Sequence, residues 1–133
     1  MKNKKILITV SIIGILIVGI ILFLSTGKTR TDVYLKDFKV SIDGTKMTLK
    51  VGVSSSVGYV RKMKRTGGSM NCYYTFYSTF GINSKLGAKD TFEINIDNNV
   101  DEIYFYTGNK GYKKVLEKND YGEWKQVNDI TNS

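Results

Sequence analysis

The sequence contains no histidine, and this absence narrows the chemistry available to the chain. Histidine is the commonest general base and the commonest metal ligand. A Ser-His-Asp triad, a Cys-His pair and a zinc site of the usual Cys/His type are therefore excluded. Carboxylates occur at Asp97, Asp101 and Glu102, but their spacing does not mark a catalytic pair. We predict no catalytic residue, no metal site, no cofactor and a protein that is not an enzyme.

Cysteine is almost absent as well: Cys72 is the single one, so no disulfide can form within the chain. Small secreted domains are commonly crosslinked by several disulfides, so the sequence disfavours the class of disulfide-rich secreted domains. Cys72 has the strand parity of Tyr74 and Phe76. This parity predicts a thiol that points into the core as an inert small hydrophobe.

A partial calcium-loop pattern occurs at Asp97, Asn99 and Asp101. Its sixth position is Glu102 instead of glycine, and its twelfth is Gly108 instead of a bidentate glutamate. We interpret the segment as a polar turn between two strands.

The formal net charge of +8 is concentrated around one segment. Five basic residues flank the apolar N-terminal run: Lys2, Lys4, Lys5, Lys28 and Arg30. Removing these five from the 20 basic residues leaves 15 against 12 acidic residues, a net of +3 for the rest of the chain. Nucleic-acid binding needs a concentrated basic surface, so we predict no nucleic-acid partner.

The apolar run Ile6–Leu24 holds 19 residues and no charge. As a helix it would be roughly 28 Å long, which is close to the thickness of the hydrocarbon core of a membrane. We predict a basic cytoplasmic tail at 1–5, a transmembrane signal anchor at 6–24 in contact with membrane lipid, and a stalk at 25–33. The alternative is a secreted protein, because Ser25, Thr26 and Gly27 are small residues that would suit cleavage near Gly27.

The orientation of the predicted transmembrane helix follows from the basic residues on its two sides. Lys2, Lys4, Lys5 and the amino terminus slightly outweigh Lys28 and Arg30, which favours an N-terminus inside the cell and a domain outside.

The remainder of the chain alternates with a period of two, the pattern of β-strands. Phe38, Val40 and Ile42 alternate with polar residues, Asp43-Gly44 supplies a turn, and 47–53 alternate again, which predicts a hairpin. Further strands are expected near 57–65, 70–80, 92–96, 103–107, 112–116 and Trp124. The fold class is therefore all-β: a small immunoglobulin-like β-sandwich of seven to eight strands over 34–127, preceded by one transmembrane helix, with a flexible tail at 128–133.

Five segments carry a resemblance to a known group of proteins: Gly58–Lys62, Thr75–Gly81, Asn83–Lys89, Glu102–Tyr106 and Tyr112–Lys118. Together they cover most of residues 57–126. The chain resembles a small extracytoplasmic β-domain found in uncharacterised lipoproteins and membrane-anchored proteins of Gram-positive bacteria. The resemblance implies a bacterial surface location and no assigned catalytic residue. Where members carry a lipobox, this chain has the apolar segment instead.

Tyrosines provide the first candidate binding surface. Tyr74, Phe76, Phe80, Ile103 and Phe105 have core parity, so the opposite faces of the same strands would show Tyr73, Tyr77, Tyr104 and Tyr106. If these strands are neighbours, the four rings line one sheet face suited to stacking on sugars or docking a protein. The alternative is a partly covered face where tyrosine simply favours the strand conformation.

Four basic residues on one expected strand form the second candidate surface: Arg61, Lys62, Lys64 and Arg65. They suit contact with an anionic surface, either lipid headgroups or cell-wall polymer. Lysines on an edge strand that prevent aggregation are the alternative explanation.

These observations favour a membrane-anchored extracytoplasmic binding or interaction module of a Gram-positive bacterium. Its partner would be a cell-surface protein or a cell-wall polymer. Two alternatives stay open: a surface immunity or exclusion factor, and a cell-wall-acting enzyme.

Overall fold

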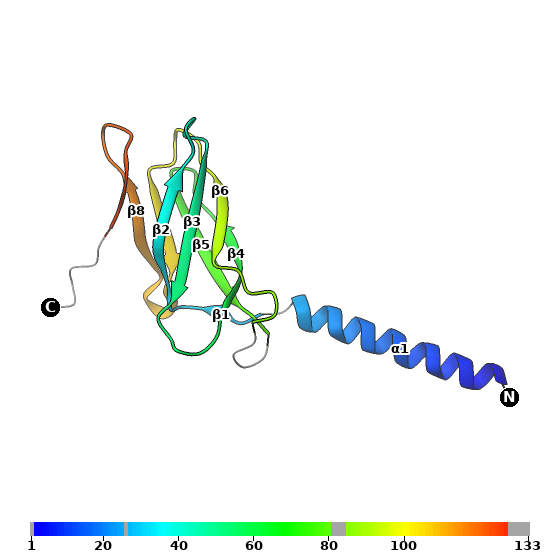
Figure 1. Cartoon of the computed structure of the whole chain (residues 1–133). Coiled ribbons are helices and arrows are strands. Elements are labelled where there is room, and N and C mark those ends of the chain that lie inside the picture. Colours follow the sequence, from blue (N-terminus) through cyan, green and yellow to red (C-terminus); the bar gives the residue numbers. More distant parts are fainter. Residues whose placement is uncertain (1, 26, 81–84, 128–133) are drawn as a thin grey trace.

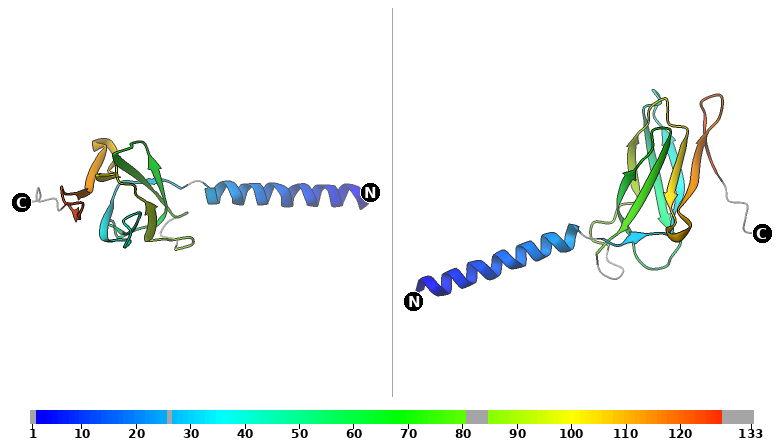
Figure 2. Two further views of the ribbon diagram at one scale, coloured as in Figure 1. Left: turned by 90° about the horizontal axis from the view of Figure 1, so that it is seen from above. Right: turned by 180° about the vertical axis from the view of Figure 1, so that it is seen from behind.

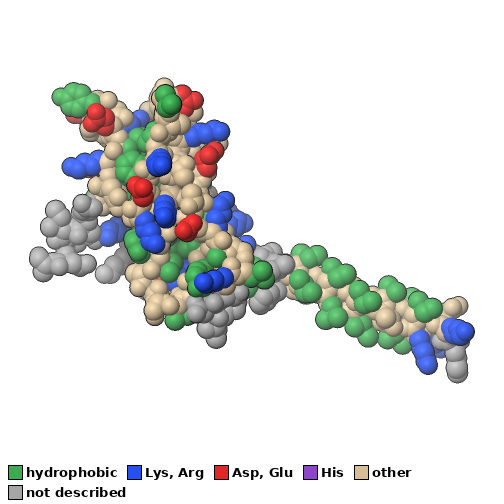
Figure 3. All heavy atoms as spheres, viewed as in Figure 1, with side chains coloured by type: hydrophobic (Ala, Val, Ile, Leu, Met, Phe, Trp, Pro, Cys, Tyr) green, Lys and Arg blue, Asp and Glu red, His purple; other side chains and the backbone are tan. Residues whose placement is uncertain are grey.

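The computed structural model describes residues 2–25, 27–80 and 85–127 of the chain, so the tail predicted at 128–133 lies outside the described residues. A single helix, α1 (Lys2–Ser25), precedes a β-rich unit (Figure 1). The side chains of α1 from Lys2 to Ile21 are exposed, and the helix projects away from the strands in all views (Figure 2). Hydrophobic side chains cover it, with lysines at its beginning (Figure 3).

Helix α1 is long and apolar enough to cross a membrane, as judged by its length and composition. The two polar side chains of the apolar run Ile6–Leu24 are hydrogen-bonded within the helix. The hydroxyl of Thr9 donates to the carbonyl of Lys5 at 2.8 Å, and that of Ser11 donates to the carbonyl of Leu7 at 2.9 Å. Neither hydroxyl is therefore left unpaired if the helix lies in lipid, where an unpaired polar group costs several kcal/mol.

The β-rich unit contains two sheets. The strands are β1 (Thr29–Arg30), β2 (Val33–Val40), β3 (Lys46–Val53), β4 (Val60–Thr66), β5 (Asn71–Ser78), β6 (Thr91–Asn95), β7 (Glu102–Tyr106), β8 (Tyr112–Lys118) and β9 (Trp124–Gln126). A short 3-10 helix, η1 (Gly108–Lys110), lies between β7 and β8. In sheet A the paired strands follow the order β1-β5-β7-β8-β9, and β4 is a third partner of β5. Sheet B has the order β2-β3-β6. The chain is therefore mostly β with one N-terminal apolar helix, as predicted.

Strand β5 lies at the centre of sheet A and has three partners. Antiparallel β4 occupies one of its sides. On the other side its first half pairs in parallel with β7, and its second half pairs with β1. Strand β6 comes between β5 and β7 in the sequence but lies in sheet B. The chain therefore crosses to sheet B after β5 and returns to sheet A at β7, and this crossover connection allows β7 to run parallel to β5.

One hydrophobic core takes residues from both sheets. Met47 and Leu49 of β3, Phe76 of β5 and Leu116 of β8 are fully buried. The ring of Phe76 meets the ring of Phe92 on β6, with centroids 6.0 Å apart. The core parity predicted for Cys72, Tyr74, Phe76, Phe80, Ile103 and Phe105 is confirmed, since all six are buried.

The hairpin predicted around Asp43-Gly44 is confirmed by the antiparallel pairing of β2 with β3. Its hydrophobic pattern differs from the prediction, because Ile42 lies in the turn and is fully exposed and Val40 is exposed at 37%. A bulge between Leu35 and Asp37 changes the parity of β2, so that Leu35 pairs with Val51 and Phe38 pairs with Leu49 on the same side. The first half of β2 therefore fills the core, while Phe38 packs at its margin.

Part of the segment predicted as a stalk at 25–33 belongs to α1 and to sheet A. Ser25 completes α1, Thr29 and Arg30 form β1 against Tyr77 and Phe76 of β5, and β2 starts at Val33. The reason is that β7 covers only the first half of this side of β5, so backbone groups of the second half are open to pairing. This extra short strand brings the described strands to nine.

Candidate functional site: the tyrosine face of sheet A

Four tyrosines form a continuous cluster on the side of sheet A that faces away from the core. We call Tyr73, Tyr104, Tyr106 and Tyr112 the tyrosine face. Tyr73 and Tyr104 are register partners on β5 and β7, and their rings stack with centroids 5.0 Å apart. Tyr112 on β8 meets Tyr73 edge-on at 4.9 Å and Tyr106 at 5.4 Å. Three strands therefore contribute rings to one surface.

Hydrogen bonds hold the margins of this cluster. The hydroxyls of Tyr112 and Thr66 lie 3.2 Å apart, and the Thr66 hydroxyl lies 3.4 Å from the carbonyl of Tyr73. Because Thr66 belongs to β4, the contacts connect four neighbouring strands. At the other margin the hydroxyl of Tyr104 donates to the carboxylate of Glu102, and this hydrogen bond raises the pKa of Tyr104 to about 12.

An ion-pair group borders the tyrosine face on β7 and β8. The ammonium of Lys114 lies 3.8 Å from a carboxylate oxygen of Glu102 and 3.2 Å from one of Glu117. All three side chains are partly exposed, so each pair contributes at most about 1 kcal/mol. Their main effect is to fix the carboxylate that accepts the Tyr104 hydroxyl.

Of the four tyrosines predicted from the sequence, the structure brings Tyr73, Tyr104 and Tyr106 into the cluster. Tyr77 lies on the same side of β5, but farther along the strand, opposite Thr29 and Lys62. Sequence reasoning missed Tyr112, the most exposed member at 38%. A strand was predicted near 112–116, but whether Tyr112 lies on the same side of the sheet as Tyr104 depends on the bulge between β7 and β8.

The four basic residues predicted as one anionic-contact surface are divided between the two sides of β4. Lys62 and Lys64 pair with Tyr77 and Thr75, are exposed, and lie on the side of the tyrosine face. Arg65 pairs with Tyr74 on the other side and donates to the carbonyl of Gly68 at 3.0 Å. The four therefore do not form a single patch.

Arg61, unlike Lys62 and Lys64, is partly buried. Its guanidinium carbon lies 4.6 Å from the centroid of the Phe80 ring, a cation–π contact, and its Nε is buried without a hydrogen-bond partner in the described part of the chain. Arg61 lies at the bulge between Val60 and Lys62 and has no register partner on β5. Arg61 thus belongs to the packing around the end of β5.

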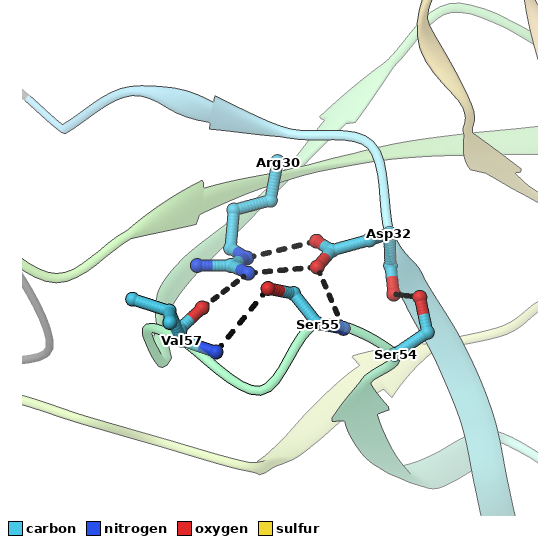
Figure 4. A network of polar contacts seen from close by, with 5 residues as sticks. All are labelled: Arg30, Asp32, Ser54, Ser55 and Val57. Carbon is cyan, nitrogen blue, oxygen red and sulfur yellow. Dashed lines mark hydrogen bonds and ion pairs between the residues drawn. The ribbon is translucent and has the colours of Figure 1, made fainter.

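A polar network joins β1 to the loop after β3 at the end of the unit that adjoins α1 (Figure 4). The guanidinium of Arg30 donates to both carboxylate oxygens of Asp32 at 2.9 and 2.8 Å, and to the carbonyl of Val57 at 3.1 Å. The backbone N–H of Ser55 donates to Asp32 at 3.2 Å. The hydrogen bonds from Arg30 hold the pKa of Asp32 below its ordinary value.

Among the residues the structure describes, the carboxylates considered from the sequence form no group of three or more that could hold a metal ion. Asp97 accepts a hydrogen bond from the backbone N–H of Asn99 at 2.9 Å, which closes a polar turn. Asp101 pairs with Lys118 at 3.7 Å, and Glu102 accepts from Tyr104.

Comparison of the chain with protein-family models, with curated proteins and with solved structures gives no match.

Proposed function

We propose that the chain is a single-pass membrane protein whose extracytoplasmic domain, a small immunoglobulin-like sandwich, binds a partner protein at the tyrosine face. The observation that carries this proposal is the contact among Tyr73, Tyr104, Tyr106 and Tyr112 on one solvent-facing side of sheet A. Tyrosine presents a large apolar ring with a polar tip and is enriched at protein interfaces.

The ring geometry favours a protein over a sugar as the ligand. A sugar stacks on the open flat side of an aromatic ring, but Tyr73 and Tyr104 stack on each other, inclined by only 23°. Tyr112 also meets Tyr73 edge-on. The surface therefore offers ring edges and hydroxyls that neighbouring rings already hold in place, and preordered side chains lose little entropy on binding.

Charge supports a partner with acidic residues. Lys62 and Lys64 border the tyrosine face on the β4 side and are exposed. The opposite border carries one net negative charge, because the single ammonium of Lys114 pairs with two carboxylates, Glu102 and Glu117. Exposed cations on one border would steer an acidic partner and set its orientation more than they would add affinity.

The test of binding uses the full-length chain in its membrane. A photo-crosslinking residue at Tyr112 should form an adduct with one defined protein, and the same residue at Tyr121, a 90% exposed turn position away from the cluster, should not. The partner so found should then bind the purified chain at least tenfold more weakly after Tyr104→Ala, with Tyr121→Ala as the control. Equal binding by both variants would refute the tyrosine face as the binding surface.

The proposed topology places the N-terminus inside and the domain outside. It can be tested with Ser56→Cys, an exposed position, in intact cells treated with a membrane-impermeant maleimide. Cys72 is fully buried and gives little background in the folded protein. Labelling of Ser56→Cys without lysis supports the topology, and labelling only after lysis reverses it. The mass of the mature protein tests whether cleavage occurs near Gly27.

A further inference from the structure

A cleft of about 560 Å³ opens between the end of the β2–β3 hairpin and the segments around Tyr59 and Lys89. Two backbone hydrogen bonds bring these segments together: Val51 N–H donates to the carbonyl of Asp90 at 2.8 Å, and Lys89 N–H donates to that of Val60 at 2.8 Å. A cleft of this volume falls in the range of small-ligand sites. It lies in a different part of the unit from the tyrosine face, since Tyr34 and Lys36 of sheet B form one of its walls.

Gly52 keeps this wall in its present arrangement. Tyr34 is the register partner of Gly52 across the hairpin. A Cβ at position 52 would lie 2.9 Å from the Tyr34 ring and 2.6 Å from Cε of Lys36. The side chains of Tyr34 and Lys36 therefore pack directly over Gly52. They can line the cleft in this way because Gly52 has no side chain.

The cleft carries an excess of positive charge. Lys36 and Lys89 both line it and are exposed, and no ion pair joins either ammonium to a carboxylate in the described part of the chain. Lys89 lies 5.2 Å from the centroid of the Phe92 ring, a contact that leaves its donors available. The acidic lining residue is Asp90, whose carboxylate accepts the Thr91 hydroxyl at 3.1 Å.

Hydroxyl donors accompany the two lysines. Ser55, Ser56, Tyr34 and Tyr59 all line the cleft. The Ser55 oxygen accepts the backbone N–H of Val57 at 3.2 Å, so its own hydroxyl hydrogen can donate elsewhere. Ammonium and hydroxyl donors around one space suit a ligand that combines an anionic group rich in acceptor oxygens with a small polar substituent, and phosphate supplies such oxygens.

The cleft also lies near the end of α1. Arg30 contacts its rim, because the guanidinium donates to the carbonyl of Val57 and packs so closely on Gly58 that a Cβ there would overlap it. Arg30 comes five positions after Ser25, where α1 ends, and five extended residues reach at most about 18 Å. If α1 spans the membrane as proposed above, the rim lies within that distance of the headgroup layer.

We propose that this cleft binds a glycerol-type phosphodiester, with Lys36 and Lys89 contacting the phosphate and the serine and tyrosine hydroxyls contacting the polar substituent. Two sources share this chemistry: the headgroup of an anionic membrane lipid, and a soluble or polymeric polyol phosphate outside the membrane. The site is independent of protein binding at the tyrosine face, so either proposal can fail without the other.

The experiment uses the full-length chain and follows backbone amide NMR signals of Ser55, Ser56 and Ala88. In one arm the chain is held in maltoside micelles, which contain no phosphate, and glycerophosphoglycerol is titrated. In the other arm the chain is placed in nanodiscs of phosphatidylcholine with and without phosphatidylglycerol. Saturable shifts of these amides in the first arm support a soluble or polymeric source. Shifts confined to the second arm support the lipid headgroup.

The variant Lys36→Gln/Lys89→Gln should weaken the response at least tenfold. Lys39→Gln/Lys125→Gln removes the same charge from exposed positions elsewhere and should leave the response unchanged. Unchanged amide signals outside the cleft establish that the variants are folded. The proposal is overturned if neither arm shifts the cleft amides, or if both double variants weaken the response equally, which would indicate general charge attraction.

Discussion

The ring of Tyr73 stacks on the ring of Tyr104, with centroids 5.0 Å apart, although a whole strand of the other sheet separates them in the sequence. Because β5 and β7 are parallel neighbours in register, the two side chains leave the sheet side by side. Tyr112 then meets Tyr73 from β8. The tyrosine face is therefore a product of strand order, and its rings restrain one another before any partner arrives.

The stacked pair should contribute measurable coupling energy. Tyr73→Leu, Tyr104→Leu and the double variant form a cycle in which we expect an interaction of about 1 kcal/mol beyond the area buried. Urea unfolding of the full chain in maltoside, followed by the fluorescence of Trp124, measures it. Tyr121→Leu, at a 90% exposed position, should change the free energy of unfolding by less than about 0.5 kcal/mol. A coupling energy near zero would mean that the stack adds no stability.

Two tyrosines, Tyr74 and Tyr104, should lose their hydroxyl protons at an unusually high pH. The hydrogen bond to Glu102 raises the pKa of Tyr104 to about 12, and burial raises that of Tyr74 to about 12. A tyrosine whose pKa is raised in the folded state stabilises the fold fully below its unfolded value of 10.0. That stability is lost as the pH rises from 10 through 12.

Ring-carbon NMR shifts measured between pH 8 and 12 test this expectation residue by residue. Glu102→Ala, which removes the acceptor, should lower the pKa of Tyr104 and leave that of Tyr74 unchanged, because the two values have different causes. If Tyr104 titrated at the same pH in both proteins, the hydrogen bond to Glu102 would not be the cause.

The turn of the first hairpin should resist acid to an unusually low pH. The Asp43 carboxylate accepts the hydroxyls of Ser41 and Thr45 at 2.6 and 2.8 Å and the backbone N–H of Thr45 at 3.1 Å. The bond from Ser41 makes the largest contribution to lowering the pKa of Asp43 to about 2. The stabilisation is present above the ordinary value near 3.8 and is lost as the pH falls toward 2.

Carboxyl-carbon NMR shifts of Asp43 from pH 5 to 1.5 give its titration directly. Ser41→Ala should raise the midpoint, whereas Ser56→Ala, in a different loop, should not move it. An Asp43 midpoint near 3.8 in the original protein would show that the turn does not hold the ionised form.

Two adjacent glycines in the turn between β4 and β5 should differ in their tolerance of alanine. Gly67 and Gly68 both have positive φ, at 68° and 83°. A Cβ at Gly67 meets nothing within 4 Å, whereas one at Gly68 would overlap the carbonyl oxygen of Asn71. Gly67→Ala should cost about 1–2 kcal/mol from backbone strain alone.

Gly68→Ala carries the same strain plus the overlap, so its cost should exceed that of Gly67→Ala by at least about 1 kcal/mol. Urea unfolding of the two variants side by side measures the difference. Equal costs would mean that the turn opens enough to admit the added methyl group.

Local patterns in the sequence were sufficient for the helix, most strands and the core. A long apolar run favours a helix, which satisfies its own backbone hydrogen bonds, and Ile6–Leu24 lies within α1. Alternation with a period of two assigned Phe76 and Phe105 to the core, and both are buried. Such assignments succeed because they depend on residues only a few positions apart.

The candidate sites were predictable only in part, because each depends on which strands become neighbours. Parity placed Tyr73 and Tyr104 on outward faces, but their stacking required the parallel pairing of β5 with β7. Tyr112 joined them because of a bulge, and another bulge placed Val60 in the core although Lys62, two positions later, faces outward. A one-residue irregularity reverses which side a residue occupies and has no clear sequence pattern.

By itself the sequence determined an apolar N-terminal helix, a β-rich remainder, an inward Cys72 and the outward parity of the tyrosines. Only the tertiary structure decided that these rings touch, that β1 belongs to sheet A, and that Lys36 and Lys89 share a cleft. The physical reason is distance along the chain. Hydrophobic periodicity is a property of adjacent residues, whereas a binding surface is made by backbone pairing and side-chain contact between segments far apart in the sequence.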